Sequence, residues 1–333
     1  VAGTHGKTTT SSILGHVLYE SGVDVTAFLG GIVEGYNTNL IGSGKTVTVV
    51  EADEFDRSFL HLHPNLSCVT SMDADHLDIY GDVAAIEESF REFAHKVPAE
   101  NLFIIKGLPL EGNTIAVNVG ADYVAQNIRI ENGFYVFDVK TKEELIENIK
   151  FGLPGHHNLT NALLAFAMAK SYGVEKEKIK KALATFKGVR RRFSFQISEE
   201  NLVYIDDYAH HPTEINAVHQ AVRELYPNKK IIACFQPHLF SRTNDFIDGF
   251  AESLSQFDEI LLLEIYPARE LPMEGVNSSW LLSKIKNENK RLVSKEELLT
   301  NFKNSDANVF VTIGAGDIGE MVKDVKKLLN EKV

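Results

Sequence analysis

Residues 1–20 read VAGTHGKTTTSSILGHVLYE, and this opening stretch decides how the rest of the chain is interpreted. Two apolar residues lead into the glycine-rich loop Gly3-Thr4-His5-Gly6, and Lys7 and Thr8 follow directly. The apolar positions of residues 11–19 then fall on one face of a helix. Because a glycine loop at a helix N-terminus directs backbone N–H groups at an anion, the stretch predicts a phosphate-binding loop.

The chemistry of such a loop assigns a role to each side chain. A lysine neutralises phosphate charge, and the next hydroxyl binds Mg²⁺. The candidate phosphate-binding residues are Gly3, Thr4, His5, Gly6, Lys7, Thr8 and Thr9. The pattern G-x-x-x-x-G-K-T departs from the common P-loop at its first position, which is Val1. A chance glycine turn is the alternative, but the order of strand, loop, lysine, threonine and helix favours a nucleoside triphosphate.

Two further segments reach the rim where this loop is expected. Glu51 follows the apolar strand 47–50, and the Asp75-His76 pair follows a strand that ends at Thr70. Since the carboxyl ends of strands share one rim in an α/β sheet, these groups can complete a metal site. The candidate Mg²⁺ ligands are Thr8, Glu51 and His76. A solvated acidic loop is the alternative for the neighbouring acids, Asp53, Glu54 and Asp56.

Composition limits the classes of protein. The chain has 333 residues, of which 44% are hydrophobic and 24% charged, so about two globular domains are expected. A net charge of -12 argues against nucleic-acid and anionic-membrane partners. The two cysteines, Cys68 and Cys234, are too few for a disulfide framework or a four-cysteine zinc site. With no apolar run of roughly 18 residues and no leader, a cytoplasmic protein is expected.

Alternating apolar runs and amphipathic segments predict an α/β fold in two parts. The first, residues 1–189, is expected to be a P-loop central domain with a mixed sheet, because Asn132-Gly133 favours a hairpin. The second, residues 190–333, is expected to be a smaller, Rossmann-like doubly wound domain. Strands are expected at 47–50, 66–70, 102–105, 115–118, 128–130, 134–137, 203–206, 230–235, 259–263 and 309–313, and helices at 159–172, 176–186 and 213–225. Val1 reads as the end of a strand, so we expect a fragment.

Polar groups follow three consecutive strands of the second part, which predicts one shared site. They lie in residues 206–212, 235–243 and 266–270. Zinc is disfavoured, because adjacent histidines point apart and no third ligand has suitable spacing. Gly314 to Gly319 matches a dinucleotide fingerprint weakly, and a tight turn is favoured. In the first part, Asn158 is expected to cap the helix that follows it, with adenine binding by Asn158 or Asn161 as the alternative.

Together these motifs, spread from Gly3 to Asp317, resemble the Mur ligases. The resemblance implies that ATP phosphorylates a muramyl carboxylate and that an amino acid then displaces the phosphate. Tyr208 and Glu214 in DDYAHHPTE favour the alanine-adding branch, with UDP-N-acetylmuramate and L-alanine as partners, over the murein tripeptide recycling ligase. The family's carbamylated lysine has no counterpart in residues 82–95, and the resemblance leads us to expect a fragment without the family's UDP-binding amino-terminal domain.

The resemblance also implies residue roles. Lys7 contacts ATP phosphates; Thr8, Glu51 and His76 bind Mg²⁺; Asn158 and Asn161 lie at adenine; Arg192 reaches phosphate; Asp207 holds ribose; and Tyr208, His210, His238 and Arg242 lie near the substrates. Catalytic roles are expected for Lys7, His210 and Arg242, with domain closure assembling the site. The rival from another class is a nucleotide-dependent switch module, and a plain phosphotransferase is a further alternative.

Overall fold

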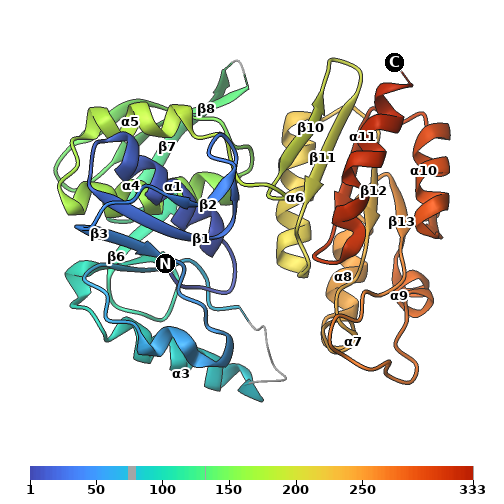
Figure 1. The fold of residues 1–333 in the computed structure, drawn as a ribbon, viewed down its shortest axis with the longest axis horizontal. Coiled ribbons are helices and arrows are strands. Elements are labelled where there is room, and N and C mark those ends of the chain that lie inside the picture. The colour runs from blue at the N-terminus through green and yellow to red at the C-terminus, as the bar shows by residue number, and fades with distance from the viewer. Residues whose placement is uncertain (74–79, 132, 333) are drawn as a thin grey trace. The chain divides into compact units, whose positions relative to one another are not determined.

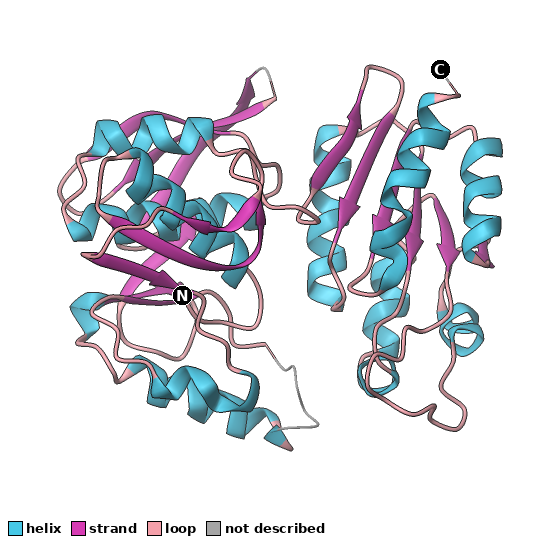
Figure 2. Ribbon diagram, in the orientation of Figure 1, coloured by secondary structure: helices cyan, strands magenta, loops and turns pink. Residues whose placement is uncertain are grey.

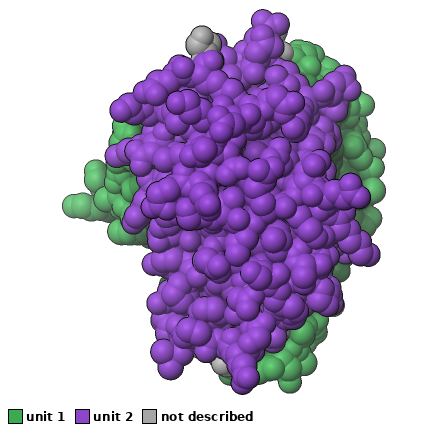
Figure 3. Space-filling view, turned by 90° about the vertical axis from the view of Figure 1, so that its right-hand side faces the viewer, with its two compact units in different colours: residues 1–190 green, residues 191–333 purple. Residues whose placement is uncertain are grey.

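A computed structural model describes residues 1–73, 80–131 and 133–332 of the chain (Figure 1). The chain divides into two units, Val1–Arg190 and Arg191–Val333, which are coloured separately in Figure 3. Each unit encloses its own clusters of buried apolar side chains. Among the helices that the structure describes, none is long and apolar enough to cross a membrane.

The first unit contains two sheets. One has the order β2-β1-β3, with β1 antiparallel to β2 and parallel to β3. The other has the order β4-β5-β6-β7-β8-β9 and is parallel as far as β7. Strands β7, β8 and β9 are antiparallel, and the pairing of Glu131 with Phe134 confirms the predicted hairpin and mixed sheet. The bounds are β1 Val25–Val33, β2 Thr38–Ile41, β3 Val47–Val50, β4 Ser67–Val69, β5 Leu102–Ile105, β6 Asn113–Val117, β7 Tyr123–Glu131, β8 Phe134–Lys140 and β9 Leu145–Phe151.

Helices cover these sheets because their apolar positions are buried (Figure 2). Helix α1 packs against α4, α5 and β1, so the helix that begins at the phosphate loop is embedded in the core. Helix α3 begins at the Asp82 cap, whose carboxylate accepts from the Ala85 backbone N–H, and packs its aromatic face on η1. The bounds are α1 Lys7–Glu20, η1 Phe55–His61, α3 Val83–Ala94, η2 Ala99–Asn101, α4 His156–Tyr172 and α5 Lys176–Thr185.

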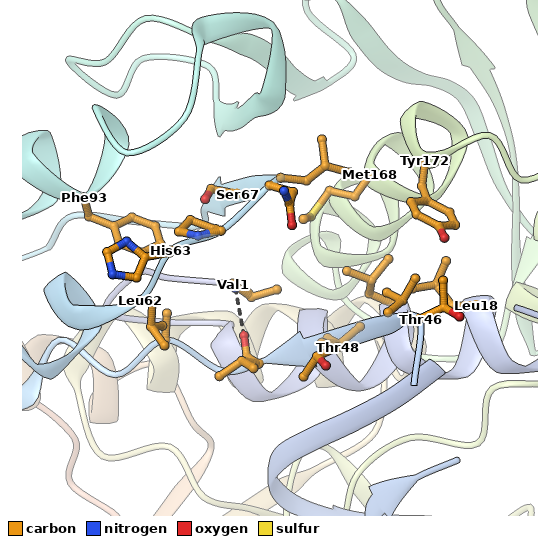
Figure 4. Close-up of a pocket in the computed structure, with 18 residues that line it drawn as sticks. Val1, Leu18, Thr46, Thr48, Leu62, His63, Ser67, Phe93, Met168 and Tyr172 are labelled. Atoms are coloured by element: carbon orange, nitrogen blue, oxygen red, sulfur yellow. Dashed lines mark hydrogen bonds between the residues drawn. The ribbon is translucent and has the colours of Figure 1, made fainter. Parts of the chain in front are cut away.

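The first two residues touch both sheets. The Val1 amino group donates to the Val50 carbonyl, and Ala2 forms a parallel bridge with Val69. Beside Val1 lies a cavity of about 450 Å³, with Thr48 of β3 and Met168 of α4 in its lining (Figure 4). The lining is mainly apolar and includes no residue assigned to phosphate, metal or substrate, so this cavity is no part of the candidate site.

The second unit is a doubly wound sheet with the order β10-β11-β15-β12-β13-β14, in which only β10 runs antiparallel to its neighbour. Ile231, Ala233 and Phe235 of β12 face one core, with α6, α8 and α9. Ile232 and Cys234 face the other, with α10 and α11, as the two-residue period of a strand requires. The Rossmann-like prediction is therefore confirmed.

The remaining bounds belong to this unit. They are β10 Ser194–Ser198, β11 Val203–Asp207, α6 Pro212–Leu225, β12 Ile231–Phe235, α7 Phe240–Asp245, α8 Ile247–Leu254, β13 Glu259–Leu262, α9 Ser278–Lys284, β14 Lys290–Leu292, α10 Lys295–Asn304, β15 Val309–Ile313, η3 Asp317–Met321 and α11 Val322–Asn330.

Candidate active site

The phosphate loop needs glycine for two reasons. Gly6 is the N-cap of α1 and has a φ of 83°, a left-handed conformation that other residues rarely adopt. Gly3 has a φ of 131°, and a Cβ there would lie 2.0 Å from Thr70 Oγ1. Without these side chains the backbone closes tightly onto the end of β4, and the N–H groups of the first turn of α1 have no side-chain cap. Open N–H groups at a helix N-terminus favour an anion.

Hydrogen bonds fix the loop to the segment after β4. The Ser71 hydroxyl accepts from the His5 backbone N–H at 2.7 Å, and the Thr70 hydroxyl donates to the His5 carbonyl. The His5 ring lies 3.2 Å from the Asp73 carboxylate. The loop is thus held in shape by its neighbours, so it is organised before any ligand arrives.

Thr8 and Glu51 meet on the rim that the sequence analysis predicted. The Thr8 hydroxyl donates to Glu51 Oε1 at 2.8 Å, while Glu51 Oε2 accepts from the Gly30 backbone N–H at 2.8 Å. Two hard oxygen ligands beside a phosphate loop fit Mg²⁺, which takes few protein ligands and completes its shell with phosphate and water. The predicted third ligand, His76, lies outside the described residues, and those described contain no cluster of three or more metal-binding side chains.

Lys7 is bound by Glu54, one of the acids for which the sequence left a solvated acidic loop as the alternative. Its ammonium donates to both carboxylate oxygens of Glu54, at 2.8 and 2.7 Å, and to the Gly3 carbonyl at 2.8 Å. Glu54 is only 1% exposed. The interpretation as a solvated acidic loop is therefore wrong for Glu54, although the neighbouring Asp53 and Asp56 are exposed.

Asn158 and Asn161 lie on α4, three positions apart, and both are buried. Helix α4 begins at His156 with Gly155 as its N-cap, so the predicted Asn158 cap is wrong. The Asn158 amide instead donates to the Pro154 carbonyl at 2.7 Å. Asn161 approaches the phosphate loop so closely that a Cβ on Gly6 would lie 2.7 Å from its Oδ1. Thr9 is buried in the first turn of α1.

In the second unit, two neighbouring arginines have different environments. Arg191 donates to the fully buried carboxylate of Asp206 at 3.2 Å and to the Gly314 carbonyl at 2.5 Å. The Arg192 guanidinium lies 5.1 Å from the centre of the Tyr208 ring and, among the described residues, makes no hydrogen bond or ion pair. Arg191 is thus committed to the fold, whereas Arg192 is available to a ligand.

Asp207, the predicted ribose ligand, closes a local turn. One carboxylate oxygen accepts from the Phe193 backbone N–H at 2.6 Å, and the other accepts from that of Ala209 at 2.7 Å. Burial raises the pKa of Asp207 to about 7. Each oxygen has a second lone pair, so the carboxylate retains capacity for a hydroxyl group.

The structure brings Tyr208, His210, His238 and Arg242 into one cluster, as the strand-end pattern predicted. The rings of Tyr208 and His210 lie 5.4 Å apart, and those of His210 and His238 lie 6.2 Å apart. Arg242 Nη1 lies 3.2 Å from His238 Nδ1. Burial, followed by the charge of Arg242, lowers the pKa of His238 to about 4, so this imidazole is neutral near pH 7.

Glu270 supports this cluster in a way that sequence reasoning did not predict. The Glu270 carboxylate accepts from the backbone N–H groups of Phe240 and Ser241, at 2.6 and 3.1 Å, and from the Ser241 hydroxyl. It therefore caps the helix α7 that carries Arg242 from a separate loop. The strand-end pattern included Glu270 but gave no indication of its partner.

The comparisons with known proteins agree with this architecture. Residues 1–169 match the family model of the Mur ligase middle domain, and residues 191–318 match that of the Mur ligase glutamate ligase domain. A UDP-N-acetylmuramate–L-alanine ligase of Flavobacterium psychrophilum is 74% identical over 333 residues, covering 100% of this chain and 74% of the relative. One from Porphyromonas gingivalis is 46% identical, covering 99% of this chain and 75% of the relative.

Solved structures lead to the same family. The crystal structure of the UDP-N-acetylmuramate-alanine ligase from Thermotoga maritima has a TM-score of 0.80 and 28% identity, covering 100% of this chain and 74% of that one. A MurF ligase from the same organism, solved in complex with ADP, has a TM-score of 0.74 and 19% identity, covering 100% of this chain and 80% of that one. The second likeness shows the fold alone. With both family models matched across two units of the expected architecture, the chain belongs to the Mur ligase family.

Proposed function

We propose that this chain provides the ATP-binding and amino-acid-binding units of a ligase that joins L-alanine to the lactyl carboxylate of UDP-N-acetylmuramate. The observation that carries the proposal is the 74% identity, over all 333 residues, to a relative named for that reaction. The phosphate loop and the cluster of Tyr208, His210, His238 and Arg242 support it, because a ligase needs both a phosphoryl donor site and an acceptor site. Since ATP is the donor, the reaction belongs in the cytoplasm.

In the first unit, the loop N–H groups and Lys7 bind the phosphates of ATP. Asn158 and Asn161 are assigned to adenine, and Thr8 and Glu51 would hold Mg²⁺, with His76 as the third expected ligand. When bound, Mg²⁺ supplies positive charge at the phosphoryl oxygens. A substrate carboxylate oxygen attacks the γ-phosphorus, ADP leaves, and an acyl phosphate results. The protein's contribution is positioning and electrostatics, with no side-chain nucleophile.

In the second unit, Arg192 is assigned to phosphate and Asp207 to ribose. The cluster of Tyr208, His210, His238 and Arg242 is assigned to the amino acid. His210 Nδ1 lies 2.9 Å from the Tyr208 carbonyl, which only accepts, so Nδ1 carries a proton and Nε2 is the ring nitrogen assigned as the base. The alanine amine attacks the acyl carbon, its proton passes to His210 Nε2, and phosphate leaves with the electron pair of the C–O bond. The Arg242 guanidinium is suited to bind a carboxylate.

The test is formation of ADP and phosphate by this chain fused to the amino-terminal domain that the family resemblance assigns to the UDP moiety. Release that requires both UDP-N-acetylmuramate and L-alanine would support the ligase. Release with the murein tripeptide in place of L-alanine would support the recycling ligase, and release without an amino acid would support a plain phosphotransferase. Nucleotide binding without turnover would support a switch module. A Lys7→Ala variant that formed amide at the parent rate would refute the role of Lys7.

A further inference from the structure

Glu54 is the acid in the phosphate site to which neither the sequence nor the proposed reaction gives a role. It lies on the turn that follows β3, three residues after Glu51, and its side chain is buried beneath the phosphate loop. Burying a carboxylate without a partner is costly, so its location requires a cation. That cation is Lys7.

We propose that Glu54 is a positioning residue that holds Lys7 in the nucleotide-free site and gives it up to phosphate when nucleotide binds. The inference rests on the proposed nucleotide-binding function and adds to it an internal competitor for the phosphate. An ammonium has three donors, and here all three are used: two by Glu54 and one by the Gly3 carbonyl. Lys7 must therefore break at least one of these bonds before it contacts a phosphate oxygen.

The turn that carries Glu54 is held from outside the phosphate loop. The Tyr80 hydroxyl donates to the Glu54 carbonyl, and the Arg57 guanidinium lies 5.4 Å from the centre of the Tyr80 ring. Asp56 and Arg57 have φ angles of 52° and 57°, which are left-handed conformations that aspartate tolerates better than arginine does. Strain at Arg57 persists only where the surroundings impose it, and the hydrogen bond from Tyr80 is one of the contacts that hold this turn.

The consequence is a cost in nucleotide affinity. A protein whose binding-competent state is only partly populated binds its ligand more weakly by that fraction. While the Lys7 ammonium is bonded to Glu54, it is not free to bind a phosphate oxygen, so the site is not yet in the state that binds nucleotide. Removing the charge of Glu54 while keeping its shape should therefore tighten nucleotide binding. General damage to the fold would have the opposite effect.

The experiment measures the dissociation constant of Mg·ADP by titration calorimetry on the full 333-residue chain. Glu54→Gln should bind Mg·ADP about three- to tenfold more tightly, since a bond between two ionised groups is stronger than one to an amide. Asp56→Asn is the matched control. It removes one charge from the same exposed turn at a position without a Lys7 contact, and asparagine tolerates the left-handed backbone. Its affinity should stay within about twofold of the parent.

A double-mutant cycle with Lys7→Ala assigns the effect to the ion pair. The gain from Glu54→Gln should disappear in the Lys7→Ala background; an equal gain in both backgrounds would show general charge repulsion and overturn the proposal. Weaker binding by Glu54→Gln would indicate that the Glu54 carboxylate helps to hold the metal, and it would also overturn the proposal. Glu54→Asp, which has a shorter side chain, should show a smaller gain in Mg·ADP affinity, and this variant replaces Glu54→Gln if the glutamine variant does not fold.

A parent chain that binds no Mg·ADP would overturn both this inference and the proposed function. A parent chain that binds Mg·ADP, together with a Glu54→Gln variant that binds it no more tightly, would overturn this inference alone.

Discussion

Gly6 and Gly22 stand at the two ends of α1 and have the same φ, 83°. Alanine at either position must adopt a left-handed backbone, which costs about 1–2 kcal/mol. The surroundings differ. A Cβ at Gly22 would meet nothing within 4 Å, whereas one at Gly6 would lie 2.7 Å from Asn161 Oδ1. Comparing alanine variants at these two positions therefore separates the effect of backbone strain from the effect of the contact with Asn161.

The structure gives the expected magnitudes. Gly22→Ala should lose about 1–2 kcal/mol in the free energy of unfolding, and Gly6→Ala at least as much, because both share the backbone strain. In Gly6→Ala the buried Asn161 side chain must also move, and the loop N–H groups move with it. We expect Gly6→Ala to weaken Mg·ADP binding at least about tenfold, which corresponds to about 1.4 kcal/mol. Gly22→Ala should bind Mg·ADP like the parent.

The assay combines urea unfolding, followed by circular dichroism, with calorimetric titration of Mg·ADP. Unfolding reports the shared strain, and titration reports the site. Equal nucleotide affinities in the two variants would refute the reasoning, because the phosphate loop would then tolerate a side chain at its closest approach to α4. A loss of affinity in Gly22→Ala would refute it as well, since that residue touches no part of the site.

Two more predictions concern the second unit. Arg191→Ala should destabilise the protein in urea unfolding by about 3–5 kcal/mol, because it leaves the buried carboxylate of Asp206 without its cation. Arg192→Ala should change stability by no more than about 0.5 kcal/mol while it slows ADP formation; equal losses of stability in both variants would contradict the assignment. The pKa of His238 is lowered from 6.5 to about 4, so the unfolded chain binds more protons between these values and stability rises with pH across that window. His238→Asn, which cannot titrate, should show a shallower rise in urea unfolding from pH 4 to 6.5, and an unchanged slope would mean that His238 carries no part of it.

Local sequence patterns predicted the parts of the fold that depend on residues close together in the chain. Strand β15 and the hairpin after β7 followed from apolar runs and turn residues. Strand β1 was not predicted, and it contains the pair Gly30-Gly31, which weakens a strand pattern. The structure gives the reason for Gly30: a Cβ there would lie 2.5 Å from Glu51 Oε2, the carboxylate of the predicted metal site. A glycine that weakens a strand signal was therefore itself a signal of close approach to the site.

The partners of the charged side chains could not be predicted from the sequence, as the run Arg190-Arg191-Arg192 shows. Arg190 lies 3.4 Å from Glu34 in the first unit, Arg191 binds Asp206, and Arg192 lies over Tyr208. Residue type is the same at all three positions, so composition and spacing could not distinguish them. The surroundings do: the guanidinium groups of Arg191 and Arg192 both lie 5.1 Å from the centre of the Tyr208 ring, and Arg191 also reaches the buried carboxylate of Asp206. Because folding brings these partners to the arginines, the role of each arginine follows only from the folded structure.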